Sequence, residues 1–356
     1  MPHRIFKLLK DSDGKAVPGP EFSRALGITR AAVWKKIRLL RAEGFQIEAS
    51  REGYRLSGGP ELCNRQLGYH MPGIKIVFKE NMPSTNDLAL LMAMDKAAPP
   101  LREKLLSALV VAGSQTAGRG RLGRAWLSPP GVNVYMSAAM RPGLPPRKAP
   151  LLALAAGLAS VLAIKGQTGL DVRLKWPNDI IVREGKNKKP GAASGIKKLG
   201  GILVELRSDP DRVLFAAVGI GINANMKKAD IPRELRARAT SIFAETGKPV
   251  DRAALIASVY RELDYWGGML NKGVEAGTEQ RPVERKLLGA YRNLCDTIGR
   301  QISVHSEGKP FTGTATGIDD DGRLILRTAG STLRFSTGDV SSVRDDGGSV
   351  RGGGSL

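Results

Sequence analysis

The chain has 356 residues, 42% of them hydrophobic and 25% charged, a composition typical of a globular protein with two or three domains. Cys63 and Cys295 are the only cysteines and there are three histidines, which excludes a disulfide framework, a CxxC zinc site and a histidine-rich metal centre. The first ten residues are too charged for a secretory signal. The most apolar run, Leu151–Ile164, is shorter than the roughly 18 residues of a membrane span, so we expect a core helix, no membrane association and a cytoplasmic protein.

The formal net charge is +21, and its distribution divides the chain. Residues 1–62 hold 12 basic and 7 acidic side chains, a net of +5, whereas residues 298–356 hold 7 of each. The middle of the chain carries the remaining +16, which indicates phosphate-bearing or acidic ligands there; charge that serves only solubility is the alternative. We expect domains at 1–62, 63–297 and 298–344, and a disordered Gly/Ser-rich tail at 345–356.

The first domain is predicted to contain three helices followed by a hairpin. Glu21–Leu26 is expected to be helical up to Gly27. Thr29 is then placed to cap a second helix, Arg30–Glu43, that Gly44 ends. Pro18-Gly19-Pro20 makes a stiff entry to the first of these two helices.

The helix after Thr29 has two distinct faces. Val33, Ile37 and Leu40 recur at helical spacing and predict a buried stripe, and Phe45–Glu48 and Tyr54–Leu56 are expected to form two strands around a turn. A helix, a turn and a basic second helix before a basic hairpin are typical of a winged helix-turn-helix, which binds DNA. A helical protein-interaction domain with solvated basic residues is the alternative. The residues predicted to contact DNA are Thr29, Arg30, Lys35, Arg38, Arg51 and Arg55.

Gln115–Met136, QTAGRGRLGRAWLSPPGVNVYM, is the most informative segment of the central domain. It lies between two predicted strands, Ala108–Ala112 and Asn133–Ala138. Glycine lets backbone amides approach an anion and arginine donates paired hydrogen bonds to phosphate or carboxylate, so this loop can close over a phosphate-bearing ligand. The GxxxxGK[ST] pattern of a P-loop is missing, and an RNA-binding or merely solvated turn fits the glycine–arginine string equally.

Further polar motifs flank that loop. Pro83–Ala89, PSTNDLA, predicts a helix N-terminus whose hydroxyl and amide groups are free to bind a polar ring. Leu174–Ile181, LKWPNDII, runs from a strand into a tight turn, and Lys198–Leu206, KLGGILVEL, begins a strand with a lysine at its mouth. Val218–Asn223, VGIGIN, predicts a strand whose glycines permit the close approach of a ligand or of neighbouring chain. Residues 183–197 read as a basic surface loop.

Residues 298–344 alternate in a β pattern between short turns. Strands are predicted at Gln301–His305, Phe311–Ile318, Arg323–Arg327 and Thr332–Ser336. Short strands over about 45 residues suggest a small SH3-like barrel, and its neutral charge argues against a second DNA-binding unit.

Taken together, PSTN, GRGRLGRAW, KWPND, KLGGILVE and GIGIN resemble the biotin–protein ligase family, in which they follow one another in this order. With the DNA-binding head and the C-terminal barrel, the chain is similar over nearly its full length to the bifunctional subclass, in which the ligase also represses biotin biosynthesis. The resemblance implies an α+β multidomain protein whose central α/β domain has the class II aminoacyl-tRNA synthetase-like fold of biotin ligases.

The resemblance also implies a two-step reaction that uses biotin, ATP and Mg²⁺. The biotin carboxylate attacks the α-phosphate of ATP, and a lysine of the biotin carboxyl carrier protein or domain then takes biotin from the adenylate. Operator DNA is the second implied partner, bound by a homodimer that forms when the adenylate is present.

The family's roles fall on matching positions of this sequence. The implied catalytic residues are Arg121, Lys198, Asp179 and Lys175, with Asp179 the implied magnesium ligand. Biotin is implied to contact Ser84, Thr85, Asn86, Gln115, Arg119, Gly120, Arg121 and Lys198. The adenylate is implied to contact Arg119, Gly120, Arg121, Arg124, Trp126, Asn178 and Asn223.

Several alternatives stay open at this point. A lipoate–protein ligase shares the fold, and a biotin-sensing transcription factor without turnover would keep much of the same pattern. Trp126 and Tyr135 are residue types more often found in the core than in ligand contacts, Asn223 is more typical of a turn, and Gly219 and Gly221 serve close strand packing equally well.

Overall fold

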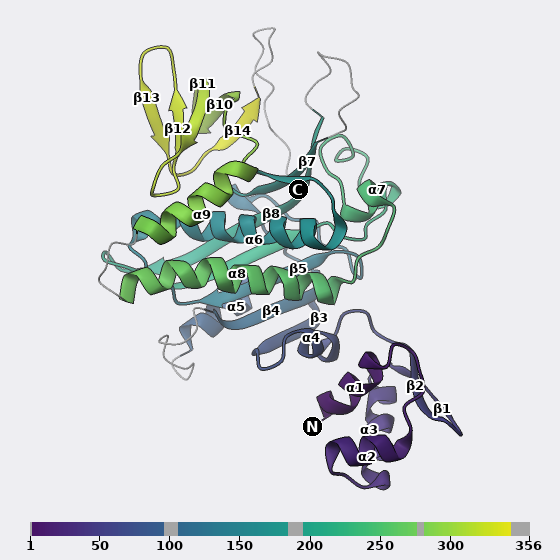
Figure 1. Cartoon of the computed structure of the whole chain (residues 1–356). Helices are drawn as coiled ribbons and strands as arrows, with labels where there is room; N and C mark the ends of the chain where they lie inside the picture. Colours follow the sequence, from purple (N-terminus) through teal and green to yellow (C-terminus); the bar gives the residue numbers. More distant parts are fainter. Residues whose placement is uncertain (1, 96–105, 184–194, 276–280, 343–356) are drawn as a thin grey trace. The chain divides into compact units, whose positions relative to one another are not determined.

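The computed structural model describes residues 2–95, 106–183, 195–275 and 281–342. The chain forms two compact units, Met1–Ile76 and Val77–Leu356, each coloured by sequence in Figure 1. The predicted tail at 345–356 and most of the predicted loop at 183–197 lie outside the described residues.

The N-terminal unit is built of helices and one hairpin. Its elements are α1 (Pro2–Asp11), α2 (Gly19–Leu26), α3 (Arg30–Ala42), β1 (Gln46–Ser50), β2 (Gly53–Gly58) and α4 (Asn64–His70). Gly27 ends α2 in the left-handed conformation at φ 64°, and the Thr29 hydroxyl accepts a hydrogen bond from the Ala32 amide at 3.2 Å. Both end signals are therefore confirmed.

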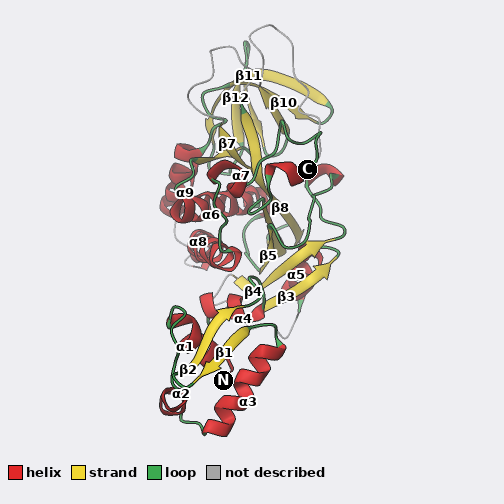
Figure 2. Cartoon of the chain, turned by 90° about the vertical axis from the view of Figure 1, so that its right-hand side faces the viewer, coloured by secondary structure: helices red, strands yellow, loops and turns green. Residues whose placement is uncertain are grey.

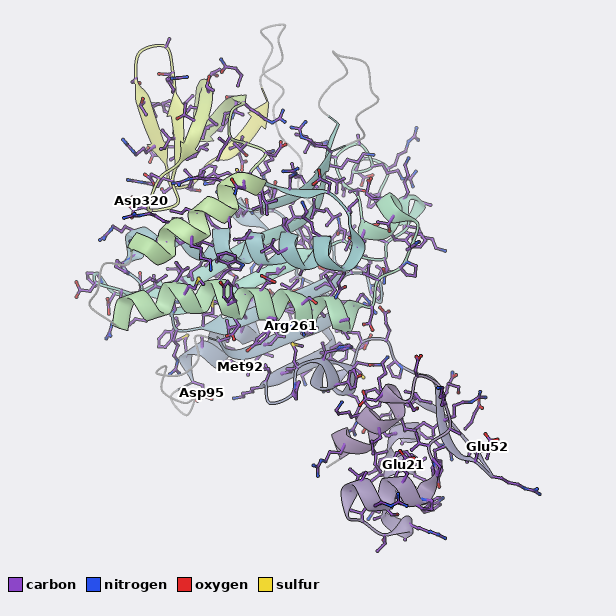
Figure 3. The ribbon with its side chains drawn as sticks, in the orientation of Figure 1. Glu21, Glu52, Met92, Asp95, Arg261 and Asp320 are labelled. Atoms are coloured by element: carbon purple, nitrogen blue, oxygen red, sulfur yellow. The ribbon has the colours of Figure 1, made fainter. Side chains whose placement is uncertain are left out.

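The core of this unit lies under the inner face of α3. Val33, Ile37 and Leu40 are buried in one cluster with Phe6 and Phe22, which confirms the predicted stripe. β1 and β2 pair antiparallel, and Figure 3 labels Glu52 in the turn between them. Apolar spacing thus fixes which side of α3 faces away from the core.

The second unit contains a seven-stranded sheet in the order β3-β4-β5-β9-β8-β7-β6. From β4 to β6 every neighbouring pair is antiparallel. The strands are β3 (Ile76–Met82), β4 (Leu106–Gln115), β5 (Val134–Met140), β6 (Val172–Lys175), β7 (Asp179–Arg183), β8 (Ile196–Ser208) and β9 (Val213–Ile222). All the strands predicted in this part are present, and β4, β8 and β9 begin before their predicted starts.

Helices cover both faces of this sheet, as Figures 1 and 2 show. The helix α5 (Thr85–Met94) lies on one face, and α6 (Pro150–Thr168), α8 (Arg252–Glu275) and α9 (Arg281–Leu294) lie on the other. A fifth helix, α7 (Ile242–Thr246), follows β9. The helix that includes α6 is long and apolar enough to cross a membrane by composition, but 67% of its apolar window is buried inside this unit, which confirms a core helix.

The C-terminal part forms a five-stranded sheet in the order β13-β12-β11-β10-β14. Its strands are β10 (Gln301–Ser306), β11 (Lys309–Ile318), β12 (Leu324–Arg327), β13 (Thr332–Phe335) and β14 (Asp339–Ser342). The four predicted strands are confirmed, and β14 adds a fifth beside β10. The Trp176 indole donates to the Gly322 carbonyl at 3.1 Å, so a tryptophan in the turn between β6 and β7 contacts the C-terminal part directly.

Candidate active site

The turn between β6 and β7 gathers polar groups at the end of the sheet. The Trp176–Pro177 peptide bond in this turn is cis, and the Asn178 side chain donates to the Ile202 carbonyl at 2.9 Å. The next residue, Asp179, forms an ion pair with Lys198 on the neighbouring strand, with 2.8 Å between Oδ1 and Nζ. Lys175 faces Asp179 in the β6–β7 register. The predicted clustering of these residues is therefore confirmed.

Arg121 in the glycine–arginine loop reaches this cluster. Its guanidinium donates to the Asn178 Oδ1 at 3.0 Å and to the Thr337 Oγ1 at 2.5 Å. Burial lowers the pKa of Arg121 from its ordinary value, while the carboxylates of Asp339 and Asp179 raise it. A half-buried cation thus lies between the β6–β7 turn and the C-terminal sheet.

The other two arginines of the loop have different partners. Arg124 forms an ion pair with Asp339. Arg119 forms ion pairs with Asp87 at 2.5 Å and Glu205 at 3.1 Å, and the hydrogen bond to Asp87 raises the pKa of Arg119. Arg121 and Arg124 therefore both reach the start of β14, whereas Arg119 bonds to side chains of α5 and β8. Of the three, only Arg121 also bonds to Asn178.

The start of α5 corrects one expectation. The hydroxyl and amide groups of Thr85 and Asn86 are not free, because a buried hydrogen-bond network uses them. The Thr85 hydroxyl donates to the Gln115 Oε1 at 3.1 Å, and the Asn86 amide donates to the Glu205 Oε2 at 2.7 Å. The Ser137 hydroxyl lies 2.7 Å from both the Thr85 hydroxyl and the Asn86 carbonyl oxygen.

This network could not be found by reading the motif alone, because its partners come from distant strands. Ser84 caps α5 by position and is also buried. The side-chain amide of Gln115 bridges Thr85 and Ser128. Glu205, at the far end of the KLGGILVEL motif, joins Asn86 to Arg119 and was missed in the sequence.

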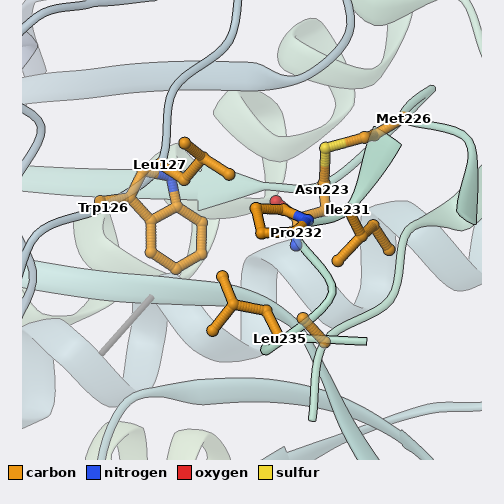
Figure 4. Close-up of a pocket in the computed structure, with 8 residues that line it drawn as sticks. Trp126, Leu127, Asn223, Met226, Ile231, Pro232 and Leu235 are labelled. Atoms are coloured by element: carbon orange, nitrogen blue, oxygen red, sulfur yellow. The ribbon is translucent and has the colours of Figure 1, made fainter. Parts of the chain in front are cut away.

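An apolar pocket lies beside Lys198. Figure 4 shows the ring of Trp126 on one side and Met226 and Ile231 on the other. The Lys198 Nζ lies over the Trp126 ring, 5.4 Å from its centroid, and the buried Trp126 Nε1 has no hydrogen-bond partner among the described residues. The lining residues are Trp126, Leu127, Asn223, Met226, Ile231, Pro232, Leu235 and Ala239.

Five of the eight residues that line this pocket come from a segment that sequence analysis missed. Residues 226–239 follow β9, and the sequence analysis assigned them no element and no role. Met226, Ile231 and Ala239 form a buried cluster with Leu235 at its edge. The spacing of these apolar residues within a basic segment was the signal that could have been used.

The glycines of VGIGIN make room for side chains. A Cβ on Gly219 would lie 2.3 Å from the Asn86 Oδ1, and a Cβ on Gly221 would lie 2.6 Å from the Trp126 ring. Asn223 lines the pocket, and its amide donates to the Thr240 carbonyl at 3.0 Å. Gly219 therefore leaves room for the Asn86 side chain of the α5 network, and Gly221 leaves room for the Trp126 ring that forms one wall of the pocket.

The candidate metal ligand has a protein partner. Asp179 is paired with Lys198, and the described ranges contain no group of three His, Cys, Asp or Glu residues that could hold a metal ion. One or two carboxylates are the usual protein contribution to a magnesium ion that arrives on nucleotide phosphates. Asp179 can supply such a carboxylate if its ion pair with Lys198 breaks when the magnesium ion binds.

The predicted DNA-contact residues lie on the N-terminal unit. Arg30, Lys35 and Arg38 are exposed on α3, and Arg51 is exposed in the hairpin turn. Arg55 is paired with Glu48 across the hairpin at 2.5 Å. Thr29 caps α3, as described above, so its side chain already has a structural role.

Comparison with known proteins covers all three parts of the chain. The biotin/lipoate A/B protein ligase family matches residues 83–225, the biotin protein ligase C-terminal domain matches 297–342, and an HTH domain matches 3–55. The bifunctional ligase/repressor BirA of Bacillus spizizenii is 33% identical over 94% of this chain and 97% of its own. BirA of Escherichia coli is 28% identical over 96% and 97%.

A solved structure supports the same assignment. The biotin protein ligase from Aquifex aeolicus in complex with biotin and ATP matches with a TM-score of 0.57 and 27% identity, over 75% of this chain and 97% of that one. An HTH domain, a central ligase domain and a C-terminal ligase domain of mostly strands thus follow one another. The chain belongs to the biotin protein ligase family.

Proposed function

We propose that this protein activates biotin with ATP and transfers it to a lysine of a biotin carboxyl carrier protein or domain. One observation carries the proposal: Lys198 lies between the Asp179 carboxylate, at 2.8 Å, and the face of Trp126, at 5.4 Å. A cation at the edge of an apolar, aromatic pocket can bind a phosphate group while the pocket holds the planar base of the same nucleotide.

In the first step, a biotin carboxylate oxygen bonds to the α-phosphorus of ATP and pyrophosphate leaves. Negative charge builds on the phosphate oxygens, and Lys198 and Arg121 are the cations positioned to offset it. In the second step, the acceptor amine bonds to the biotin carbonyl carbon, loses its proton and releases AMP. Because the intermediate is hydrolysed by water, the glycine–arginine loop is proposed to cover it.

The two ends of the adenylate are proposed to occupy different parts of the site. Trp126 and Asn223, which line the apolar pocket, are assigned to the nucleotide. Gly120, Arg124 and Asn178 of the loop and the turn are proposed to contact it as well. Biotin is assigned to the start of α5, where Ser84 is buried and Thr85 donates to Gln115. Asn86 and Arg119 are already engaged in the polar network, so we expect biotin to replace part of it.

Magnesium is assigned to the nucleotide. Its phosphates supply most of the oxygen ligands that Mg²⁺ prefers, and Asp179 is the proposed protein ligand, with Lys175 beside it in the register. The charge that the metal supplies would stabilise the leaving pyrophosphate.

The N-terminal unit is proposed to act as a winged helix-turn-helix, with α3 in the major groove and the β1–β2 hairpin as the wing. The name of the relatives, ligase/repressor, supports regulation of transcription. We further propose a homodimer on adenylate binding, an SH3-like C-terminal barrel, a cytoplasmic location, and the domain limits 1–62, 63–297 and 298–344.

Transfer of labelled biotin to a carrier domain in the presence of ATP and Mg²⁺ tests the enzymatic proposal. Labelling with lipoate but not biotin would favour a lipoate ligase instead. Retention of biotinyl-adenylate without any transfer would favour a biotin-sensing regulator. A salt-dependent gel shift with and without biotin and ATP tests the DNA-binding role.

A further inference from the structure

Trp34 is an exposed aromatic residue on the outer side of α3. The inner face of this helix is complete without it, because Val33, Ile37 and Leu40 are buried in the core. Trp34 keeps 52% of its surface exposed. Aromatic side chains bury large apolar areas when they lie in a core. About half of the Trp34 surface instead faces solvent in this unit.

The ring of Trp34 does have one partner, the guanidinium of Arg38. The Arg38 Cζ lies over the ring at 4.8 Å from its centroid, the distance of a cation–π contact. Residues four apart share a helix face, and helix side chains lean toward the N-terminus. The contact with Trp34 therefore keeps the guanidinium of Arg38 close to the N-terminal half of α3.

Arg41 on the same helix behaves differently. Its guanidinium donates to the Ile47 carbonyl at 2.9 and 2.5 Å, so it fastens the helix to β1. The guanidinium of Arg38, by contrast, makes no hydrogen bond to another of the described residues, and its contact is with the Trp34 ring. Stacking leaves the N–H donors at the edge of the guanidinium plane available to a ligand.

We propose that Trp34 is a positioning residue that holds Arg38 flat to read a guanine in the major groove of DNA. The inference rests on the proposed DNA-binding function. Base edges are contacted by the N-terminal half of such a helix, and the arginine fork matches the O6 and N7 acceptors of guanine. A duplex is favoured over other partners because the outer face carries basic residues and the first 62 residues have a net charge of +5.

The test is selection of duplexes with about 20 randomised base pairs by the full-length protein with biotin, ATP and Mg²⁺. Wild type is compared with Arg38→Lys, Trp34→Ala and Trp34→Phe, and Arg51→Lys in the hairpin turn is the control for a phosphate contact. Circular dichroism and thermal unfolding of each variant check that the N-terminal unit is folded, and biotin transfer checks the ligase part. We expect wild type to select a motif with one fixed guanine in each half-site.

Arg38→Lys should reduce the preference for that guanine by about fivefold to a hundredfold. Trp34→Ala should reduce it by about twofold to fivefold, and Trp34→Phe should restore most of it. Arg51→Lys should change affinity for all sequences alike. If wild type selects no motif, the DNA-binding proposal and this inference both fail. If it selects one that Trp34→Ala and Arg38→Lys leave unchanged, only this inference is overturned.

Discussion

The guanidinium of Arg124 forms an ion pair with the carboxylate of Asp339, a residue 215 positions further along the chain. The contact joins the glycine–arginine loop to the first residue of β14. Beside it, Arg121 donates to the hydroxyl of Thr337. The C-terminal sheet therefore holds the loop that we propose to cover the adenylate, so residues far from the reacting atoms should control how well the intermediate is retained.

Asp339→Asn should accelerate the release of biotinyl-adenylate. Both side chains are about one-third exposed, at 34% and 30%, so the pair is worth no more than about 1 kcal/mol and the release rate should rise about twofold to fivefold. Single-turnover release of labelled adenylate measures this rate. The control is Asp339→Glu, which keeps the carboxylate and should keep retention near that of wild type; an unchanged rate in Asp339→Asn would contradict the role of the contact.

Arg121→Gly should have a larger effect on release than on synthesis. The substitution removes the hydrogen bonds to Asn178 and Thr337, two contacts worth about 1 kcal/mol each, and release should become at least about tenfold faster. Adenylate should still form, because Lys198 remains. Capture of free adenylate by an added amine checks the result, and equal capture from wild type would count against it.

Lys198→Ala should abolish adenylate synthesis. Loss of one fixed cation at a developing oxyanion lowers the rate by about 10² to 10³, and no other lysine is paired with Asp179 among the described residues. ATP–pyrophosphate exchange driven by biotin measures the step directly. Lys197→Ala is the matched control, because neighbouring strand residues point to opposite faces; similar losses in both variants would show a structural effect.

The N-terminal unit could be predicted closely from its sequence because its signals are local. The left-handed Gly27, the capping hydroxyl of Thr29 and the buried stripe beginning at Val33 all act within a few residues. The same is true of the strand pattern around the turns of the C-terminal sheet. Apolar spacing and helix end signals depend on neighbours in sequence, so the amino-acid sequence alone was enough to place these elements.

Pairings between distant segments could not be predicted in this way. Nothing near Arg124 points to Asp339, and nothing near Asn86 points to Glu205. Hydroxyl and amide groups at the start of α5 looked available for a ligand because their partners lie on β4, β5 and β8. The pocket wall formed by Met226 was missed for the same reason. Motif order indicated the chemistry, but the contacts of each motif depend on tertiary structure.

Gly219→Ala and Gly221→Ala should separate the two halves of the proposed site. The new methyl group at 219 would lie 2.3 Å from the Asn86 Oδ1, and the one at 221 would lie 2.6 Å from the Trp126 ring. We therefore expect Gly219→Ala to raise the KM for biotin and Gly221→Ala to raise the KM for ATP. Each should also lower the free energy of unfolding by about 1 to 3 kcal/mol, because the interior is overpacked.

Denaturant unfolding and steady-state kinetics with each substrate varied in turn measure both effects. Gly268→Ala is the control, since a methyl group there meets nothing within 4 Å and an alanine in a helix is favoured over glycine by about 1 kcal/mol. This variant should keep wild-type KM values and unfold no more easily. If the variants at 219 and 221 raised both KM values equally, the assignment of biotin to the α5 side and of the nucleotide to the Trp126 pocket would be wrong.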